Sequence, residues 1–294
     1  MDNGTKWRIG DVEISRIPEF EMPLFDPAMI YPDLPKERLD RHRAWLEPRF
    51  LDPATGKLNM SIHAFVIRTT RHAILVDACS GNDKERPSRP LFHRQNRPWL
   101  DRLGAAGFKP GDIDYVLCTH LHIDHVGWNT RLVDGRWVPT FPRARYLITK
   151  AEWEHWQNEE NLKGYADDNH IKDSVLPIVA AKQAEFVAMD HVIDDEVWFE
   201  PTPGHTPGHA AIHIRSAGQE AVISGDLMHT VVQVAEPELS TCFCTDKSLS
   251  ARTRRAFLER YADRPVIVLP AHFPTPTGGF VKPDGGSFRF NFDS

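Results

Sequence analysis

Short runs of apolar residues, each ended by turn-forming residues, recur along the chain and predict a sheet-rich protein. Residues 7–17 alternate apolar and polar side chains around Gly10-Asp11, a dipeptide typical of tight turns, and so predict a hairpin. Similar runs predict further strands over 61–68, 73–77, 115–119, 145–149, 197–199, 210–214, 221–224 and 266–269. The predicted strands occur in both halves of the chain.

Between these strands, apolar residues recur at helical spacing. Helices are predicted over 98–106, 151–161, 168–184 and 248–261, the third with a break at Pro177. Strand pairs with helices between them in both halves indicate an αβ unit used twice, although the sequence contains no strong repeat. Because no Gly/Ser-rich linker separates the halves, residues 1–294 are predicted to form a single domain.

The segment 18–53 does not fit either pattern. Prolines stand at positions 18, 23, 27, 32, 35, 48 and 53, with large apolar side chains between them. Repeated proline argues against a long regular element, and the large side chains need cover. We therefore expect an irregular arm that lies across the body of the protein and walls a pocket.

Composition narrows the function classes. Hydrophobic residues make up 41% of the chain and charged residues 26%, which is ordinary for a soluble globular protein. The net charge of −6 and the pI of about 6.2 lack the basic character of a nucleic-acid binder. No stretch approaches ~18 uninterrupted apolar residues, and residues 1–6 lack the apolar part of a secretory signal. We expect a cytoplasmic protein with a small-molecule partner, bound to neither nucleic acid nor membrane.

Four cysteines are too few and too scattered to indicate a disulfide framework, so reduced thiols are expected. Cys242 and Cys244 form a Cys-x-Cys pair that could chelate a metal. Two residues apart on extended backbone would also share one face of a strand without any such role, and the pattern favours this second interpretation.

The strongest chemical signal is the stretch 119–127, which follows the apolar run 115–118. His120, His122, Asp124 and His125 fall within six consecutive positions. Imidazole and carboxylate suit a borderline ion such as zinc, and the absence of thiolates favours a catalytic over a structural site. His120 and His122, two positions apart on extended backbone, can bind one ion. Asp124 and His125 lie beyond the turn and can reach a second ion. The alternative is a polar loop whose histidines bond to backbone.

Three later segments carry candidate ligands at the same kind of position. His205, Asp226 and His272 each follow directly after a predicted strand, as does His209 in the string Pro-Gly-His-Thr-Pro-Gly-His. Functional side chains gather at strand ends because the sheet positions them while the loop exposes them. Taken together with the histidine cluster, these residues are predicted to converge on one site.

The order His-x-His-x-Asp-His, then histidine, aspartate and histidine, resembles the metallo-β-lactamase superfamily over roughly 61–272. The resemblance implies an α+β fold, a four-layer αββα sandwich with metals at one edge between the sheets. It implies that one metal is bound by His120, His122 and His205, the other by Asp124, His125 and His272, and that Asp226 bridges them. It also places the ligand at His205 rather than His209, and gives Asp77 and His209 supporting positions.

Asp226 narrows the resemblance further. Metallo-β-lactamases proper usually lack this bridging carboxylate, whereas the lactonase, phosphotriesterase and glyoxalase II branches keep it. The sequence around it is most similar to the quorum-quenching lactonases and the methyl parathion hydrolase group. One departure is His229, which stands where some of those lactonases have a tyrosine. Related lactonases are often homodimers, and we carry this over as an expectation.

These features lead to a hypothesis of a dinuclear metal-dependent hydrolase that opens an acyl lactone. Two divalent ions would share a hydroxide that attacks the ester carbonyl. Zinc is the first expectation for both ions, although manganese, cobalt and iron accept the same donors. Asp124 would pass a proton to the leaving group, and His229 would donate to the developing oxyanion, so these two are the predicted catalytic residues.

Four other functions stay open. A phosphotriesterase or arylesterase would use the same nucleophile in a different pocket. A glyoxalase II-like thioesterase would need basic glutathione-binding residues, which are not found by position. An iron-dependent sulfur dioxygenase uses a related pattern with one metal. A metal-stabilised binding scaffold would keep the ligands without turnover.

Overall fold

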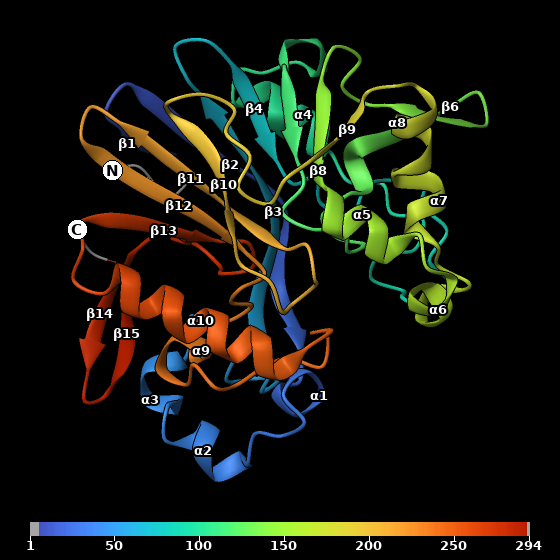
Figure 1. Cartoon of the computed structure of the whole chain (residues 1–294). Helices are drawn as coiled ribbons and strands as arrows, with labels where there is room; N and C mark the ends of the chain where they lie inside the picture. The colour runs from blue at the N-terminus through green and yellow to red at the C-terminus, as the bar shows by residue number, and fades with distance from the viewer. Residues whose placement is uncertain (1–5, 293–294) are drawn as a thin grey trace.

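The larger of two main sheets contains seven strands in the order β1-β2-β3-β4-β5-β8-β9 (Figure 1). The computed structural model describes residues 6–292. The strands are β1 (Lys6–Ile9), β2 (Val12–Phe25), β3 (Leu58–Arg68), β4 (Ala73–Val76), β5 (Tyr115–Leu117), β8 (Arg145–Thr149) and β9 (Ala184–Val187). Pairing is antiparallel from β1 to β4 and parallel from β4 to β9.

The second main sheet has four strands in the order β10-β11-β12-β13. They are β10 (Val197–Pro201), β11 (Ala210–Ser216), β12 (Gln219–Gly225) and β13 (Val266–Pro270), and the last two are parallel. Two separate hairpins are formed by β6 (Thr130–Val133) with β7 (Arg136–Pro139), and by β14 (Phe280–Asp284) with β15 (Ser287–Asn291).

Helices lie on the outer faces of both sheets. On the larger sheet are α4 (Trp99–Ala105), α5 (Lys150–Trp156), α6 (Glu159–Leu162), α7 (His170–Ser174) and α8 (Leu176–Ala180), and on the smaller one α10 (Lys247–Tyr261) (Figure 1). Shorter helices are α1 (Pro27–Ile30), α2 (Lys36–Asp40), α3 (Arg43–Leu46) and α9 (Val232–Ala235), with 3-10 turns at 110–112, 127–129 and 163–165. None of the helices within 6–292 combines the length and apolar character that crossing a bilayer requires.

Alternating side chains build the layers. On β4, Ile74 and Val76 pack between the two sheets, while Ala73 and Leu75 point to the helices outside. On β12, Ile223 faces the other sheet and Val222 faces α10. A period of two is what a strand buried on both faces requires. The result is helix, sheet, sheet, helix, which confirms the predicted four-layer αββα sandwich; that residues 1–294 form one domain stays a prediction.

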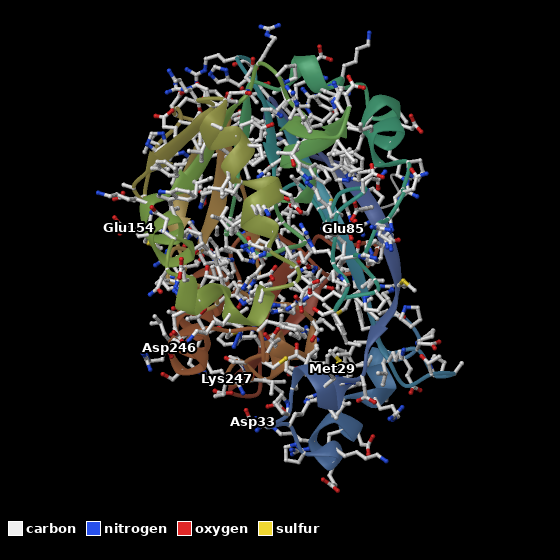
Figure 2. The ribbon with its side chains drawn as sticks, turned by 90° about the vertical axis from the view of Figure 1, so that its right-hand side faces the viewer. Met29, Asp33, Glu85, Glu154, Asp246 and Lys247 are labelled. Atoms are coloured by element: carbon white, nitrogen blue, oxygen red, sulfur yellow. The ribbon has the colours of Figure 1, made fainter. Side chains whose placement is uncertain are left out.

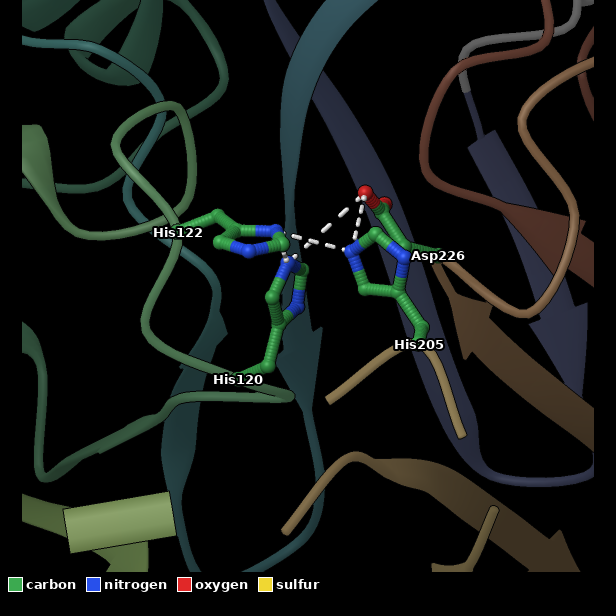
Figure 3. Close-up of side chains that lie close together, drawn as sticks. All are labelled: His120, His122, His205 and Asp226. Carbon is green, nitrogen blue, oxygen red and sulfur yellow. Dashed lines mark hydrogen bonds and ion pairs between the residues drawn. The ribbon is translucent and has the colours of Figure 1, made fainter. Parts of the chain in front are cut away.

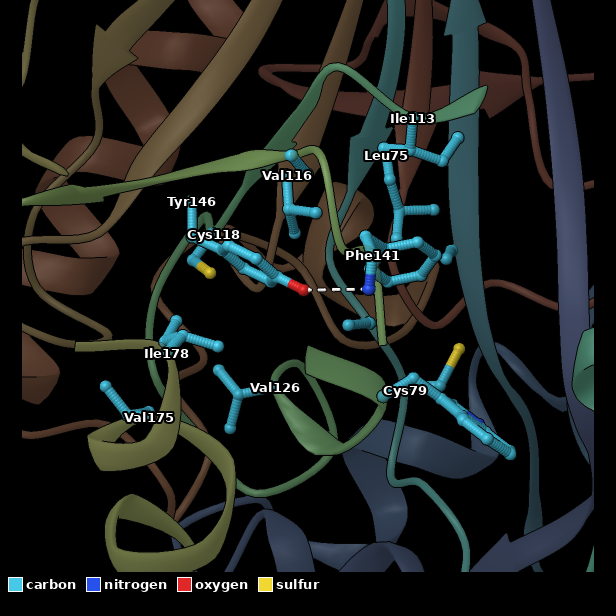
Figure 4. Packing of buried hydrophobic residues seen from close by; sticks show 14 of the residues in the cluster. Leu75, Cys79, Ile113, Val116, Cys118, Val126, Phe141, Tyr146, Val175 and Ile178 are labelled. Carbon is cyan, nitrogen blue, oxygen red and sulfur yellow. Dashed lines mark hydrogen bonds between the residues drawn. The ribbon is translucent and has the colours of Figure 1, made fainter. Parts of the chain in front are cut away.

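The outer cluster on the larger sheet carries one polar group into its interior. Val116, Cys118 and Ile178 surround the ring of Tyr146, whose hydroxyl accepts the backbone N–H of Phe141 at 3.1 Å (Figure 4). The same hydroxyl donates to the carbonyl of Asn129 at 3.1 Å. A buried phenol with both hydrogen bonds made avoids the cost of an unpaired polar group.

The expectation of an irregular arm over 18–53 is wrong for its first part. β2 runs through Phe25 while it pairs with β3, and its register shifts after Pro18 and again after Pro23. Among residues 6–292, no strand pairs with the other side of β2 beyond Ser15; side chains of α4 bond there to the carbonyls of residues 17–19. Proline is tolerated on a strand with a free edge and next to a bulge, which explains why both fit.

Three predicted element boundaries are also corrected. The helix expected over 168–184 is two short helices that separate at Val175, and its last residue already begins β9. The helix expected over 151–161 ends at Trp156, and α6 starts anew because the side chain of Asn158 caps it. The strand expected over 115–119 ends at Leu117, so the histidine cluster lies on loop backbone rather than extended strand. β9 and both hairpins were not predicted.

Candidate metal centre

The predicted ligands lie in four loops that meet at one edge of the two sheets. One loop follows β5, and the others follow β10, β12 and β13 of the second sheet. β5 runs parallel to β4, and β12 runs parallel to β13, so the carboxyl ends of these strands point to the same edge. Each loop leaves its strand at this edge, which brings residues 120–125, 205, 226 and 272 together.

One group consists of His120, His122, His205 and Asp226, all buried, with one ligand atom of each within 4.8 Å of the others (Figure 3). Nδ1 of His122 lies 3.1 Å from Nε2 of His120 and 2.8 Å from Nε2 of His205. Oδ2 of Asp226 is 3.3 Å from the His205 nitrogen. Three imidazole nitrogens and a carboxylate oxygen therefore face one small volume.

A second group consists of Asp124, His125 and His272. Asp226 joins it through its other oxygen: Oδ1 lies 3.2 Å from Nε2 of His125 and 3.0 Å from Nε2 of His272. Both of these nitrogens are 3.8 Å from an oxygen of Asp124. The carboxylate of Asp226 thus stands between the two groups, one oxygen toward each.

Hydrogen bonds alone do not satisfy this arrangement. A neutral imidazole carries one hydrogen, so the three nitrogens around His122 leave lone pairs directed at one another. Nε2 of His125 and Oδ1 of Asp226 are buried and have no hydrogen-bond partner within 6–292. A cation among these atoms would satisfy all of them, and the nitrogen and oxygen donors match the preference of zinc and related divalent ions.

The protonation states of the histidines differ between the two ligand groups. Burial holds the pKa of His120 and His205 well below the usual value and lowers the pKa of His122 to about 3. Burial also disfavours charge on His125, but nearby carboxylates, Asp226 first, outweigh it and raise the pKa of that ring. Burial would raise the pKa of Asp226, yet the surrounding histidines hold it well below its usual range. The first group therefore presents neutral imidazoles, whereas in the second group the raised pKa of His125 and His272 favours protonated rings beside the charged Asp226.

Further contacts orient these side chains. Asp77, at the end of β4, accepts the Nδ1 hydrogen of His125 at 2.8 Å and the backbone N–H of Thr119 at 2.9 Å. His209 lies outside both groups; its Nε2 accepts the backbone N–H of Asp226 at 3.0 Å. A carboxylate or carbonyl behind a histidine fixes the ring and its tautomer. Of the two histidines in the repeated string, the structure brings His205 and not His209 into a group.

Sequence reasoning missed Glu152. This buried carboxylate on α5 accepts the backbone N–H of Leu121 at 3.0 Å and that of Gly208 at 3.1 Å. It also accepts the indole N–H of Trp156 at 2.7 Å. Glu152 thereby joins the loop after β5 to the loop after β10. No spacing signal distinguishes it from the exposed acidic residues of the same helix.

Members of both groups form the floor of a cavity of about 300 Å³. Its polar lining includes His122, Asp124, Asp226, His229 and His272. Apolar side chains form most of the wall: Leu24, Phe25, Met29, Met60, Ile62, Leu91, Phe92, Ile123, Tyr165 and Phe243. Nε2 of His229 lies 3.2 Å from Oδ2 of Asp226, so this predicted catalytic residue is placed at the junction of floor and wall.

The charge at the rim of the cavity is neutralised. Arg89 is ion-paired with the buried carboxylate of Asp168, and its guanidinium carbon lies 4.5 Å from the centroid of the Tyr165 ring. Arg89 lines the cavity, but its charge is paired with Asp168. An uncharged, partly apolar ligand fits such a lining better than an anion does.

The amino-terminal segment is fixed against α10 beside this cavity. Lys247, at the start of α10, donates to the carboxylate of Asp33 at 2.8 Å (Figure 2). The backbone N–H of Cys242 donates to the carbonyl of Ile30 at 2.8 Å. These contacts hold α1 where Met29 reaches the cavity wall.

Fold and site together define the class of protein. Residues 59–272 match the family model of the metallo-beta-lactamase superfamily, and the chain belongs to this superfamily. The structure brings the seven residues predicted as ligands together in the two groups.

Individual proteins are similar over different lengths. An N-acyl homoserine lactonase of Bacillus cereus is 26% identical over 171 residues, which cover 54% of this chain and 60% of that protein. The chain thus spans about three fifths of the length of this curated relative. The hydrolase AbOPH of the beta lactamase superfamily is similar in structure with a TM-score of 0.81, 25% identity and 98% of both chains covered. AidC, a dizinc quorum-quenching lactonase, has a TM-score of 0.78 at 22% identity and covers 98% of this chain and 97% of its own.

Proposed function

We propose that the protein is a metal-dependent hydrolase that opens the ring of an N-acyl homoserine lactone or a closely related acyl lactone. The observation that carries the proposal is the position of Asp226, whose two oxygens face two separate ligand groups. His120, His122 and His205 would hold one divalent ion, Asp124, His125 and His272 the other, with Asp226 shared between them. Zinc suits these donors, and manganese, cobalt or iron would also fit.

Two bound divalent ions would supply a water-derived nucleophile at neutral pH and polarise the ester carbonyl. Side chains of the protein would supply the proton transfer and the stabilisation of the oxyanion. Asp124 is the more accessible carboxylate, with 18% of its side chain exposed against 4% for Asp226, and it lines the cavity. It would carry a proton to the alkoxide that leaves when the ring opens. His229 would donate to the oxyanion, because its ring lies beside the same floor.

The choice of an acyl lactone rests on the cavity and on the relatives. Apolar side chains on the wall would bind an acyl chain, while the polar floor would receive the lactone ring. The curated relatives are N-acyl homoserine lactonases, and the similar structure of AidC holds the product N-hexanoyl-L-homoserine. Arg89 is paired within the protein, which disfavours an anionic substrate.

The test is a substrate panel run beside elemental analysis of the same preparation. Purified protein with about two zinc ions per chain is expected to hydrolyse acyl homoserine lactones much faster than an aryl phosphotriester or S-lactoylglutathione. An Asp226→Asn variant is expected to lose metal and turnover together. Fully loaded protein that leaves short- and long-chain lactones intact would overturn the proposal. Preference for the phosphotriester would reassign the substrate class and keep the metal chemistry.

A further inference from the structure

The ligand histidines differ in what lies behind them. His125 donates its Nδ1 hydrogen to the carboxylate of Asp77 at 2.8 Å, and His272 donates to the carbonyl oxygen of Ser61 at 3.0 Å. His205 has a sulfur instead: its Nδ1 lies 3.6 Å from Sγ of Cys244. An oxygen partner is chemically inert, whereas a thiol can be alkylated or oxidised.

The hydrogen bonds around Cys244 are mutually consistent. Its S–H donates to Oγ of Ser250 at 3.5 Å, which leaves the sulfur free to accept the Nδ1 hydrogen of His205. Oγ1 of Thr241 lies 3.5 Å from the same sulfur. With its hydrogen on Nδ1, His205 presents the lone pair of Nε2 toward Asp226, 3.3 Å away. This is the tautomer that can ligate.

The backbone holds this contact in place. The N–H of Thr245 donates to the carbonyl of His205 at 2.8 Å, and the N–H of Asp246 donates to the carbonyl of Gly204 at 3.0 Å. Gly204 has a φ of +130°, and a Cβ there would lie 2.3 Å from the backbone nitrogen of Ser250. Only glycine lets the loop after β10 approach the first turn of α10 so closely. The turn that carries Cys244 is therefore tied directly to the loop that carries His205.

The structure also separates the two residues of the Cys-x-Cys pair. They lie on a turn rather than a strand, so the interpretation that both share one strand face is wrong. Cys242 is exposed and Cys244 is partly exposed, whereas Cys79 and Cys118 are buried. Cys242 thus offers a matched control two positions away on the same turn.

We propose that Cys244 is a positioning residue of the metal centre: its sulfur holds the His205 ring for ligation, and covalent modification of the thiol abolishes this role. The inference rests on the proposed function, because it requires that His205 bind a metal. It adds a thiol-modification site that is coupled directly to one ligand group.

Zinc affinity of three variants tests the positioning role, measured by competition with a chelating dye. Cys244→Ala is expected to weaken one of the two sites about tenfold, the low end for a residue behind a metal ligand, since sulfur is a weak acceptor. Cys244→Ser keeps an acceptor and should stay within about threefold of wild type, and Cys242→Ala should match wild type. The absorption bands of cobalt-loaded protein should change in Cys244→Ala alone. Equal affinities and spectra in all variants would overturn the inference.

Alkylation tests the modification site on protein that is already folded. In metal-free Cys242→Ala protein, iodoacetamide should form a sulfur–carbon bond at Cys244 as the carbon–iodine bond breaks, with the proton passing to buffer. The modified protein should bind zinc at one site about tenfold more weakly, and zinc added first should slow alkylation. Unchanged binding of two ions after complete alkylation would contradict the inference. Wild-type protein that binds no divalent ion would instead overturn the proposed function.

Discussion

At the scale of single residues, Asp226 organises the site. One of its oxygens faces each ligand group, and its own backbone N–H donates to His209. Each oxygen faces two or more imidazoles, which keeps the carboxylate charged despite burial. Loss of this one charge would leave both groups without their shared anion, so its removal should affect both ions.

The role of His229 can be separated from metal binding. His229→Phe removes the donor while keeping a ring of similar size, and we expect kcat for lactone hydrolysis to fall about 100-fold with little change in KM. His229→Tyr restores a donor near the same place and should recover part of the loss. Zinc content, measured on each variant, is the control. A phenylalanine variant with full metal and wild-type kcat would remove His229 from the mechanism.

The convergence of seven residues in the two groups could be predicted from sequence, because histidine and aspartate at such spacing are typical of metal sites; that they bind metal stays a prediction. Glu152 and Cys244 could not be found in the same way. Each acts on a ligand loop far away in the sequence, Glu152 on Gly208 and Cys244 on His205. Only the folded chain shows which polar residue is close to which loop.

At the scale of elements, the bulge in β2 has a defined use. The register shift after Pro18 leaves Glu19 unpaired in the ladder and turns its carboxylate inward. There it accepts the backbone N–H groups of Ser80 and Gly81, both at 3.1 Å, and the indole N–H of Trp128 at 2.8 Å. It thus joins the loop after β4 to the segment that follows the histidine cluster. A bulge often re-aims one side chain in this way.

Glu19→Gln tests this contact. The amide keeps one acceptor oxygen but turns an NH₂ group toward N–H donors, so buried hydrogen bonds are lost. We expect the free energy of unfolding to fall by about 3 kcal/mol, measured by urea denaturation of metal-free protein. Glu13→Gln, at an exposed carboxylate on the same strand, should change it by much less. Equal small effects of both substitutions would mean that the hydrogen bonds accepted by Glu19 contribute little to stability.

Element prediction succeeded where a strand has a short apolar run and failed where context decides. The strands of the second sheet and helix α10 follow their patterns closely. Prolines led to an irregular arm over 18–25, although a free edge and bulges permit a strand there. The hairpin β6–β7 has mostly exposed or partly exposed residues without a period of two, which leaves no pattern to detect. β15 does alternate polar and apolar residues, and this signal at 287–291 was overlooked.

At the scale of the whole molecule, buried histidines couple stability to pH. His170 is fully buried between Trp156 and Tyr165, and desolvation lowers its pKa to about 3. In the unfolded chain its pKa is about 6.5, so between these values the unfolded state binds a proton that the folded state does not. Its contribution to stability is therefore complete above pH 6.5 and is lost as pH falls toward 3.

His170→Phe should remove this contribution. We expect the free energy of unfolding of the variant to depend less steeply on pH below 6.5, by up to about 1.4 kcal/mol per pH unit. Denaturant unfolding of metal-free wild type and variant between pH 4 and 8 measures the difference. His72→Phe, a substitution at a partly exposed histidine, is the matched control. Parallel curves for wild type and His170→Phe would show that this ring does not titrate differently on unfolding.

Among residues 6–292, β2 has no strand beside it beyond Ser15, and only the carbonyls of residues 17–19 are bonded to α4, which has a consequence for chains in a crowded solution. A long unpaired strand offers a row of backbone donors and acceptors to any neighbouring chain, and such rows start aggregates. Beyond Ser15 that row is interrupted twice, because Pro18 and Pro23 lack an N–H and each is followed by a break in register. Pro18 and Pro23, which led to the prediction of an irregular segment, thus also make this stretch a poor template for intermolecular sheet growth.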